Sequence, residues 1–244
     1  MNKLLIFSDI HANLTALHAV LNDAFSKYQP DGLILLGDII NYGMRPNEVI
    51  SLLTQTQCPI LVNLIGNHEK ALLDGDLSHF STERGKYLLN YTSSILSDDS
   101  FSYIQRKMNP TAIFSIELSE KKILFIHGDI DDPYWGKLSA DKIHDIRYST
   151  YDYVFSGHTH LPHYIESYYS IDCPSLRNKK KTVFINPGSV GQPRNHNPYA
   201  QYVYIDIING LVHFNAVPYN VKIEQALYPE KVDPFYKNRI LIGI

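Results

Sequence analysis

The chain has 244 residues, with 22 Lys and Arg against 25 Asp and Glu, so its formal charge is −3. Hydrophobic residues make up 44% and charged residues only 19%, which favours an extensive core and excludes intrinsic disorder. The charge balance does not support nucleic-acid binding, and no run of about 18 apolar residues predicts a membrane span. Two cysteines, Cys58 and Cys173, form no disulfide framework. We therefore expect a soluble, cytoplasmic protein of enzyme size.

Six short apolar runs end abruptly at polar or glycine-containing turns. They cover residues 4–7, 33–36, 60–65, 123–126, 153–155 and 183–185. Runs of this length, bounded by such turns, are typical of strands buried on both faces. Each following loop should therefore emerge at the carboxyl end of a strand.

Between the first strands the apolar spacing becomes helical. One stripe runs from Leu14 to Tyr28 with Asn13 as its cap, and a second helix should start near Pro46. This alternation of strand and helix predicts a mostly parallel sheet with right-handed crossovers.

In the rest of the chain the predicted secondary structure changes twice, first to helices and then back to strands. Residues 71–109 carry no strand pattern and predict two or three inserted helices, whereas strands return at 111–118, 202–207 and 212–216. Residues 171–181 predict an exposed loop, and residues 223–227 and 235–240 predict short helices. We expect a single domain over residues 1–244. Its fold should be α/β, with two packed mixed sheets flanked by helices and a helical insert at about 71–109.

Polar side chains that bind metals follow five of the buried strands. They are Asp9, His11, Asp38, Asn67, His68, His127, His158 and His160. A lone histidine is more often a satisfied core residue than a ligand, but all of these fall where an α/β sheet gathers its functional loops. Oxygen and imidazole donors suit borderline divalent ions such as manganese, iron, zinc, nickel or cobalt.

Residue spacing adds a geometric expectation. In an extended segment residues i and i+2 point to the same side, so Asp9 and His11 should reach one ion together, and so should His158 and His160. The two carboxylate oxygens of Asp38 could bridge two ions.

The motifs D-x-H at 9–11, G-D at 37–38, G-N-H-E at 66–69, H-G at 127–128 and G-H-T-H at 157–160 resemble the calcineurin-like metallophosphoesterase family. The segments 37–50 and 186–194 are similar to its small bacterial and archaeal branch, which includes symmetrical dinucleoside tetraphosphate hydrolase-like proteins. The resemblance covers essentially the whole chain. It implies a site with two divalent ions, with manganese the first choice.

The resemblance also implies a role for each residue. The first ion would be held by Asp9, His11, Asp38 and His160. The second would be held by Asp38, Asn67, His127 and His158. Asp38 would bridge the ions, a hydroxide between them would attack phosphorus, and His68 would protonate the leaving oxygen.

The expected activity is hydrolysis of a phosphodiester or phosphoanhydride in a small phosphorylated or nucleotide substrate, such as a dinucleoside polyphosphate. A phosphomonoesterase or protein phosphatase is the alternative, followed by a non-catalytic scaffold. Arg194 and Asn41 are candidates for substrate binding. Asp129 and Glu69 depart from the residues usual in the branch, which leaves the identity of the substrate open.

Overall fold

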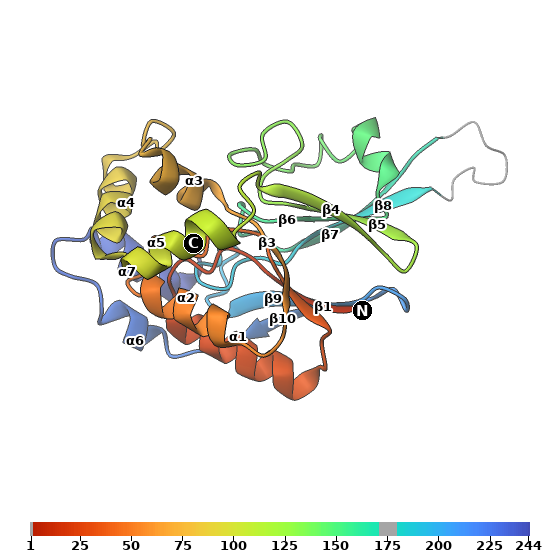
Figure 1. Ribbon diagram of the computed structural model, residues 1–244. Helices are drawn as coiled ribbons and strands as arrows, with labels where there is room; N and C mark the ends of the chain where they lie inside the picture. Colours follow the sequence, from red (N-terminus) through yellow and green to blue (C-terminus); the bar gives the residue numbers. More distant parts are fainter. Residues whose placement is uncertain (1, 171–179) are drawn as a thin grey trace.

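The computed structural model of the protein describes residues 2–170 and 180–244 (Figure 1). Cys173 and most of the predicted loop 171–181 lie outside the described residues. The helices are α1 Leu14–Lys27, α2 Pro46–Gln55, α3 Asn67–Asp74, α4 Glu83–Ile95, α5 Asp98–Lys107, α6 Val221–Gln225 and α7 Pro234–Ile242, with a 3₁₀ helix at Ile146–Thr150. The strands are β1 Lys3–Phe7, β2 Gly32–Leu35, β3 Ile60–Asn63, β4 Ile113–Leu118, β5 Lys121–Ile126, β6 Tyr153–Ser156, β7 His163–Tyr168, β8 Lys181–Asn186, β9 Ala200–Asp206 and β10 Leu211–Val217.

The strands form two mixed sheets of five. The first sheet has the order β10-β9-β1-β2-β3, and the second has the order β4-β5-β6-β8-β7. In each sheet the three strands β1-β2-β3 or β5-β6-β8 are parallel, and the remaining two pair antiparallel. The predicted α/β class with two packed mixed sheets is confirmed.

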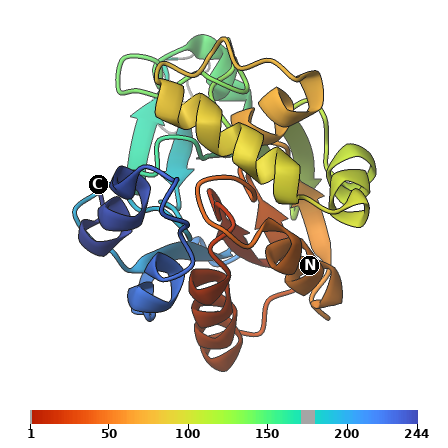
Figure 2. The same ribbon diagram turned by 90° about the vertical axis from the view of Figure 1, so that its left-hand side faces the viewer.

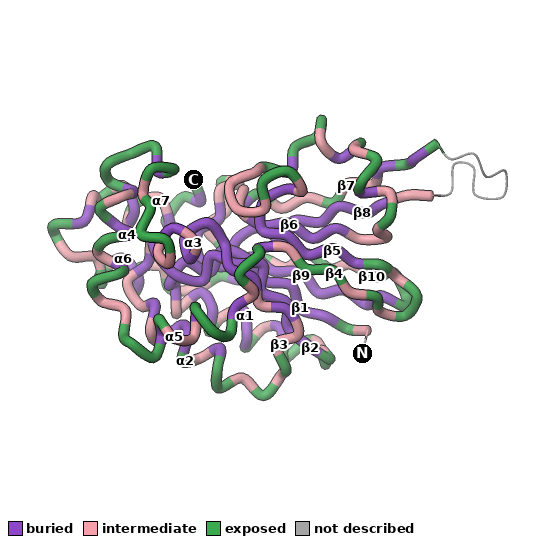
Figure 3. Tube along the Cα trace, turned by 45° about the horizontal axis from the view of Figure 1, so that its top comes forward, coloured by how far each residue is buried: buried purple, intermediate pink, exposed green. Residues whose placement is uncertain are grey.

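Side-chain alternation along the strands builds three apolar layers. Figure 3 shows that the central strands β1, β5 and β6 are buried along most of their length. In β1, Leu5 and Phe7 pack outward beneath α1 and α2, whereas Leu4 and Ile6 point between the sheets. On the far face of the second sheet, Leu124 packs with the residues near the 3₁₀ helix. Both sheets are thus covered on two faces, which explains why the strands read as continuous apolar runs.

Local chemistry accounts for the predicted helix starts. The Asn13 side chain accepts a hydrogen bond from the backbone of Ala16 at 3.0 Å and caps α1. Pro46 is the first residue of α2, as predicted. Helix α3 begins earlier than the predicted insert, at Asn67, so the G-N-H-E motif forms a helix N-terminus rather than a loop.

One strand, β7, was not predicted. Its sequence, His163–Tyr168, contains no apolar run because it is an edge strand that pairs only with β8. Tyr164 and Tyr168 are exposed on it. An edge strand has only one neighbour to stabilise it, so its sequence carries a weaker signal than the buried strands.

The loops that follow the parallel strands of both sheets meet at one end of the molecule. Figure 2 looks onto this end, where α4, in yellow, and α7, in deep blue, flank those loops. The backbone N–H of His158, after β6, donates to the Asp9 carboxylate, after β1, at 3.1 Å. The two sheets therefore contribute to one site.

Candidate metal centre

Three of the predicted residues bring one donor atom each to a first donor group: Asp9 Oδ1, His11 Nε2 and His160 Nε2. The two imidazole nitrogens are 3.2 Å apart. Asp9 Oδ1 lies 3.1 Å from His160 Nε2 and 3.8 Å from His11 Nε2. Ligands about 2.1 Å from one ion are about 3.0–3.5 Å from each other, so these separations suit a shared cation.

Asn67 Oδ1, His127 Nε2 and His158 Nδ1 form a second donor group. The amide oxygen of Asn67 lies 3.0 Å from His127 Nε2 and 2.9 Å from His158 Nδ1. All three side chains come from strand ends, two of them in the second sheet. The structure thus places every predicted ligand except Asp38 in one of two adjacent groups.

Asp38 lies between the two groups, and one of its oxygens faces both. Its Oδ2 atom is 3.9 Å from His11 Nε2 and 3.3 Å from His127 Nε2. Its Oδ1 atom instead accepts the backbone N–H of His68 at 2.9 Å. Because Oδ1 accepts this hydrogen bond, Oδ2 is the oxygen that faces both groups, and bridging through both carboxylate oxygens stays a prediction.

The expectation that His158 and His160 share one ion is wrong. His158 belongs to the second group and His160 to the first. The spacing argument assumed an extended backbone, but both residues have left-handed φ angles, 63° and 59°. Asp9 and His11 do face the same group, although their φ angles of 54° and 48° are left-handed as well. Such strained backbone is concentrated at functional sites.

Backbone carbonyls fix the imidazoles of three histidines. The Nδ1–H groups of His11, His127 and His160 donate to the carbonyls of Ile40, Leu36 and Gln192, at 3.1, 2.8 and 2.5 Å. A carbonyl only accepts hydrogen bonds, so in each ring Nδ1 carries a proton and Nε2 points into the site. This arrangement is usual for histidines that hold a metal.

The donor atoms fit metal ions better than they fit each other. Neutral His11 and His160 would direct two lone pairs at one another, and Asp9 Oδ1, fully buried, receives no hydrogen bond. Burial lowers the pKa of His11 well below its usual value and that of His158 to about 3, so these rings stay unprotonated. Burial also opposes charge on Asp9, but His160 beside it keeps the pKa of Asp9 below its usual range.

The pKa of His127 is shifted in the opposite direction. Burial disfavours its charged form, but the adjacent Asp38 carboxylate outweighs this and raises the pKa of His127 to about 9. Metal binding at neutral pH must therefore displace a proton from His127. We expect calorimetry in buffers of different ionisation enthalpy to show release of about one proton per protein at pH 7.5, and metal affinity to rise with pH until about 9. Binding without proton release would contradict this protonation state.

His68 lies beside both groups, and with His11 and Asp38 it forms a further set of side chains that could hold a metal ion. Its Nε2 atom is 3.9 Å from Asp38 Oδ2, and its Nδ1 atom is 2.6 Å from the Asn41 amide nitrogen. Asn41 Oδ1 accepts from the Tyr42 backbone and the Thr92 hydroxyl, so its nitrogen must donate to His68. His68 therefore keeps its proton on Nε2, facing the site.

The two residues that depart from the branch have structural roles. Asp129 accepts the backbone N–H groups of Asp131 and Asp132 at 2.9 and 3.0 Å and pairs with Lys142, so it stabilises its own loop. Glu69 accepts three backbone N–H groups, those of Asp38, Ile40 and Gly66, at 2.9, 3.0 and 2.8 Å. Motif analysis missed this role, although a Glu at the third position of a helix is a known capping signal.

Removal of the Glu69 carboxylate should destabilise the loops that carry Asp38. In Glu69→Ala, three buried N–H groups lose their acceptor, so we expect the free energy of unfolding of the metal-free protein to fall by about 2–5 kcal/mol. Denaturant unfolding measures this change. Glu117→Ala, at an exposed position of β4, is the control. A loss below about 0.5 kcal/mol would show that Glu69 does not support these loops.

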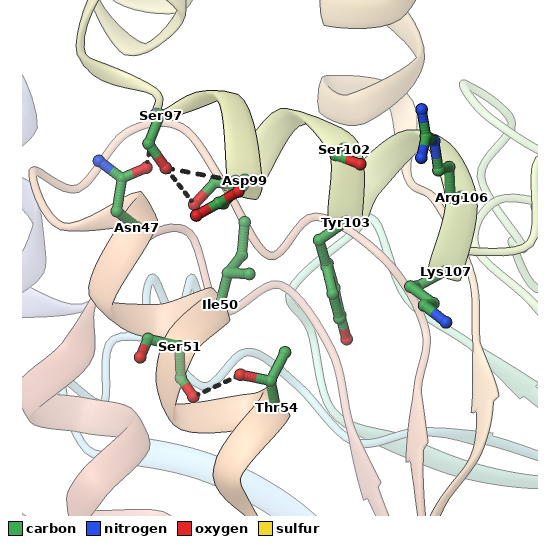
Figure 4. Close-up of a pocket in the computed structure, with 11 residues that line it drawn as sticks. Asn47, Ile50, Ser51, Thr54, Ser97, Asp99, Ser102, Tyr103, Arg106 and Lys107 are labelled. Atoms are coloured by element: carbon green, nitrogen blue, oxygen red, sulfur yellow. Dashed lines mark hydrogen bonds between the residues drawn. The ribbon is translucent and has the colours of Figure 1, made fainter.

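A polar groove of about 690 Å³ lies away from these donor groups, between α2 and α5 (Figure 4). Its lining includes Ser51, Thr54, Tyr103, Arg106 and Lys107. None of the predicted ligands lines it, so the groove is separate from the candidate centre.

Residues 2–210 match the calcineurin-like phosphoesterase superfamily domain, and the chain belongs to this superfamily. It is a hydrolase of phosphoric esters from a metal-dependent family, with a His and Asp cluster that could bind metal. An uncharacterized protein of Methanocaldococcus jannaschii is 28% identical over 243 residues, which are 98% of this chain and 97% of the relative. Phosphodiesterase YfcE of Escherichia coli is 27% identical over 208 residues, 84% of this chain and 88% of the relative.

Solved structures share the whole fold. A metallophosphoesterase from Sphaerobacter thermophilus has a TM-score of 0.78 and 28% identity, over 99% of this chain and 100% of that one. A hypothetical protein from Pyrococcus horikoshii also has a TM-score of 0.78, at 19% identity over 100% and 99% of the two chains, which supports the fold alone. No helix in the described part of the chain is long and apolar enough to span a membrane.

Proposed function

We propose that this protein hydrolyses phosphodiester or phosphoanhydride bonds with two divalent ions held side by side. The observation that carries the proposal is the position of Asp38 Oδ2, within 4 Å of imidazole nitrogens from both donor groups. A single oxygen placed in this way can bridge two cations.

Asp9, His11 and His160 would hold one ion, Asn67, His127 and His158 the other, and Asp38 both. The imidazole, amide and carboxylate donors fit manganese, and also iron, zinc, nickel or cobalt. When bound, two such ions supply an acidified water as nucleophile and neutralise charge on the phosphoryl oxygens.

The protein itself supplies a proton and a rigid frame. His68 holds its proton on Nε2 because Asn41 donates to Nδ1, so the N–H group faces the site and is suited to the leaving oxygen. Burial lowers the pKa of His68 to about 4, so the free ring is neutral and donates a hydrogen bond. An approaching phosphate would raise this pKa, so that the ring takes up a proton from water before it gives one to the leaving oxygen.

Asn41 acts on the substrate through His68 rather than by direct contact, because all its polar atoms are occupied within the protein. Arg194 lies at the edge of the centre, where its backbone N–H donates to the His160 carbonyl at 3.4 Å. We assign Arg194 to substrate binding. A phosphoanhydride, as in a dinucleoside polyphosphate, would offer it a second anionic group.

A substrate panel with metal-free protein and added manganese tests the proposal. The panel contains bis-p-nitrophenyl phosphate, diadenosine tetraphosphate, p-nitrophenyl phosphate and a phosphopeptide. We expect manganese-dependent turnover of the first two, with metal analysis giving two ions per chain. Turnover of the two monoesters alone would favour a phosphomonoesterase, and neither bound metal nor turnover would leave only a scaffold.

A further inference from the structure

Three arginines from separate segments converge beside the first donor group. They are Arg84 in α4, Arg194 in the loop after β8 and Arg239 in α7, and we call them the arginine cluster. Arg84 and Arg239 lie over the same ring, that of Phe235, at 3.8 and 4.8 Å from its centroid. Stacking on one ring holds the two guanidinium groups in place.

Tyr42 connects the cluster to the metal centre. The ring centroid of Tyr42 is 4.6 Å from that of His11 and 4.6 Å from that of His68. On its other side Tyr42 stacks on Tyr236 at 5.3 Å, and its hydroxyl lies beside the Arg194 guanidinium. One aromatic ring thus separates Arg194 from His11 and from the proton donor His68.

Two members of the cluster, Arg194 and Arg239, have no side-chain carboxylate as partner in the described part of the chain. Arg194 Nε is buried without a hydrogen-bond partner, and its guanidinium otherwise donates to the neutral Gln192. Arg239 Nε donates to the backbone oxygen of Ile244. Within residues 2–170 and 180–244, neither arginine pairs with a side-chain carboxylate.

Like charges at close range destabilise one another unless an anion joins them. Burial and the nearby Arg194 lower the pKa of Arg239 to about 10. Phosphate oxygens match the planar N–H edge of a guanidinium, and the resulting bonds are charge-assisted.

We propose that Arg194 and Arg239, with the Tyr42 hydroxyl, form a subsite for a second phosphoryl group of the substrate. This inference rests on the proposed function, because the first phosphoryl group is the one that the metal centre hydrolyses. It narrows the substrate class to phosphoanhydrides with consecutive phosphates, and disfavours simple phosphodiesters. Arg84, paired with Asp233 at 4.0 Å, contributes charge from the rim.

The test compares Arg194→Gln and Arg239→Gln with wild-type protein on two substrates. Diadenosine tetraphosphate carries adjacent phosphates, whereas bis-p-nitrophenyl phosphate has only one. We expect kcat/KM on the tetraphosphate to fall about 10- to 100-fold in each variant. The loss on the aryl diester should be at least about tenfold smaller, because it lacks the group that the cluster binds.

A binding measurement supplies a readout that does not depend on turnover. Inorganic pyrophosphate, titrated into the protein by calorimetry, should bind about 10- to 100-fold more weakly to both variants, whereas inorganic phosphate should change little. Arg147→Gln, at an exposed arginine of the 3₁₀ helix, is the matched control and should change neither ligand. Melting temperatures, together with Arg194→Lys and Arg239→Lys, separate lost charge from lost folding.

The outcomes are distinct. Equal losses on both substrates would overturn the subsite, because the cluster would then serve the scissile phosphate or the fold. Weaker binding of free phosphate with unchanged turnover of the tetraphosphate would also overturn it, since the cluster would bind a separate anion. Wild-type protein that turns over neither substrate would contradict the proposed function, and pyrophosphate binding would then still decide the subsite.

Discussion

Asp38→Asn is expected to lower kcat/KM by about 1,000-fold or more while the fold is retained. The asparagine oxygen can still accept the His68 N–H, so α3 keeps its place. Its amide nitrogen, however, would replace Oδ2 between the two donor groups. A neutral N–H₂ donor there cannot bridge cations, so bound metal should fall from two ions to one or none.

Activity and metal content should therefore decline together. Turnover of bis-p-nitrophenyl phosphate and metal analysis of the same samples measure the two quantities, and the melting temperature of metal-free protein checks the fold. Glu117→Gln makes the same chemical change at an exposed position and should alter neither quantity. Near-normal turnover by Asp38→Asn, or two ions retained, would show that Asp38 does not bridge.

The layered fold could be predicted because strands that are buried on both faces form short, continuous apolar runs in the sequence. Leu4 to Phe7, for example, are all fully buried, with alternate residues in two different cores. Strand β7 was not predicted, because one side of it has no partner strand and its exposed Tyr164 and Tyr168 interrupt the apolar run. The edge strands β3, β4 and β10 were predicted, so prediction failed only where exposed side chains interrupt the apolar run.

The position of the motifs at strand ends predicts the candidate site as a set of residues, and the family resemblance implies how they divide between two groups, whereas the spacing argument alone does not. Motifs at strand ends identified all the donors, since the sheet brings such loops together. The partition of His158 and His160 depends on left-handed backbone that no periodicity reveals. The orientation of Asp38, with Oδ2 facing both donor groups, depends on a hydrogen bond from the start of α3, a contact between segments 30 residues apart.

The arginine cluster could not be predicted from the sequence, for a different reason. Arg84 and Arg239 belong to no motif, and they lie 110 and 45 residues from Arg194 in the sequence. Only the packing of α4 and α7 around the loops places them together, with Phe235 between two of them. Two residues of the arginine cluster therefore come from helices that no sequence motif marks.

His68→Ala should impair catalysis according to how strongly the leaving group needs a proton. The structure places the only polar hydrogen of His68 on Nε2, because the Asn41 amide occupies Nδ1. For an aryl phosphodiester with an unsubstituted phenol as leaving group, we expect kcat to fall about 100- to 10,000-fold. For p-nitrophenolate, which leaves readily as an anion, the loss should be far smaller.

A series of aryl diesters with different leaving-group pKa values tests this expectation quantitatively. The plot of log kcat against leaving-group pKa should be steeper for His68→Ala than for wild-type protein, since only wild type offsets the developing charge with a proton. His18→Ala, at an exposed position of α1, is the control and should follow the wild-type line. Parallel lines for His68→Ala and wild type would mean that His68 orients the substrate and gives no proton, because loss of orientation slows all leaving groups alike.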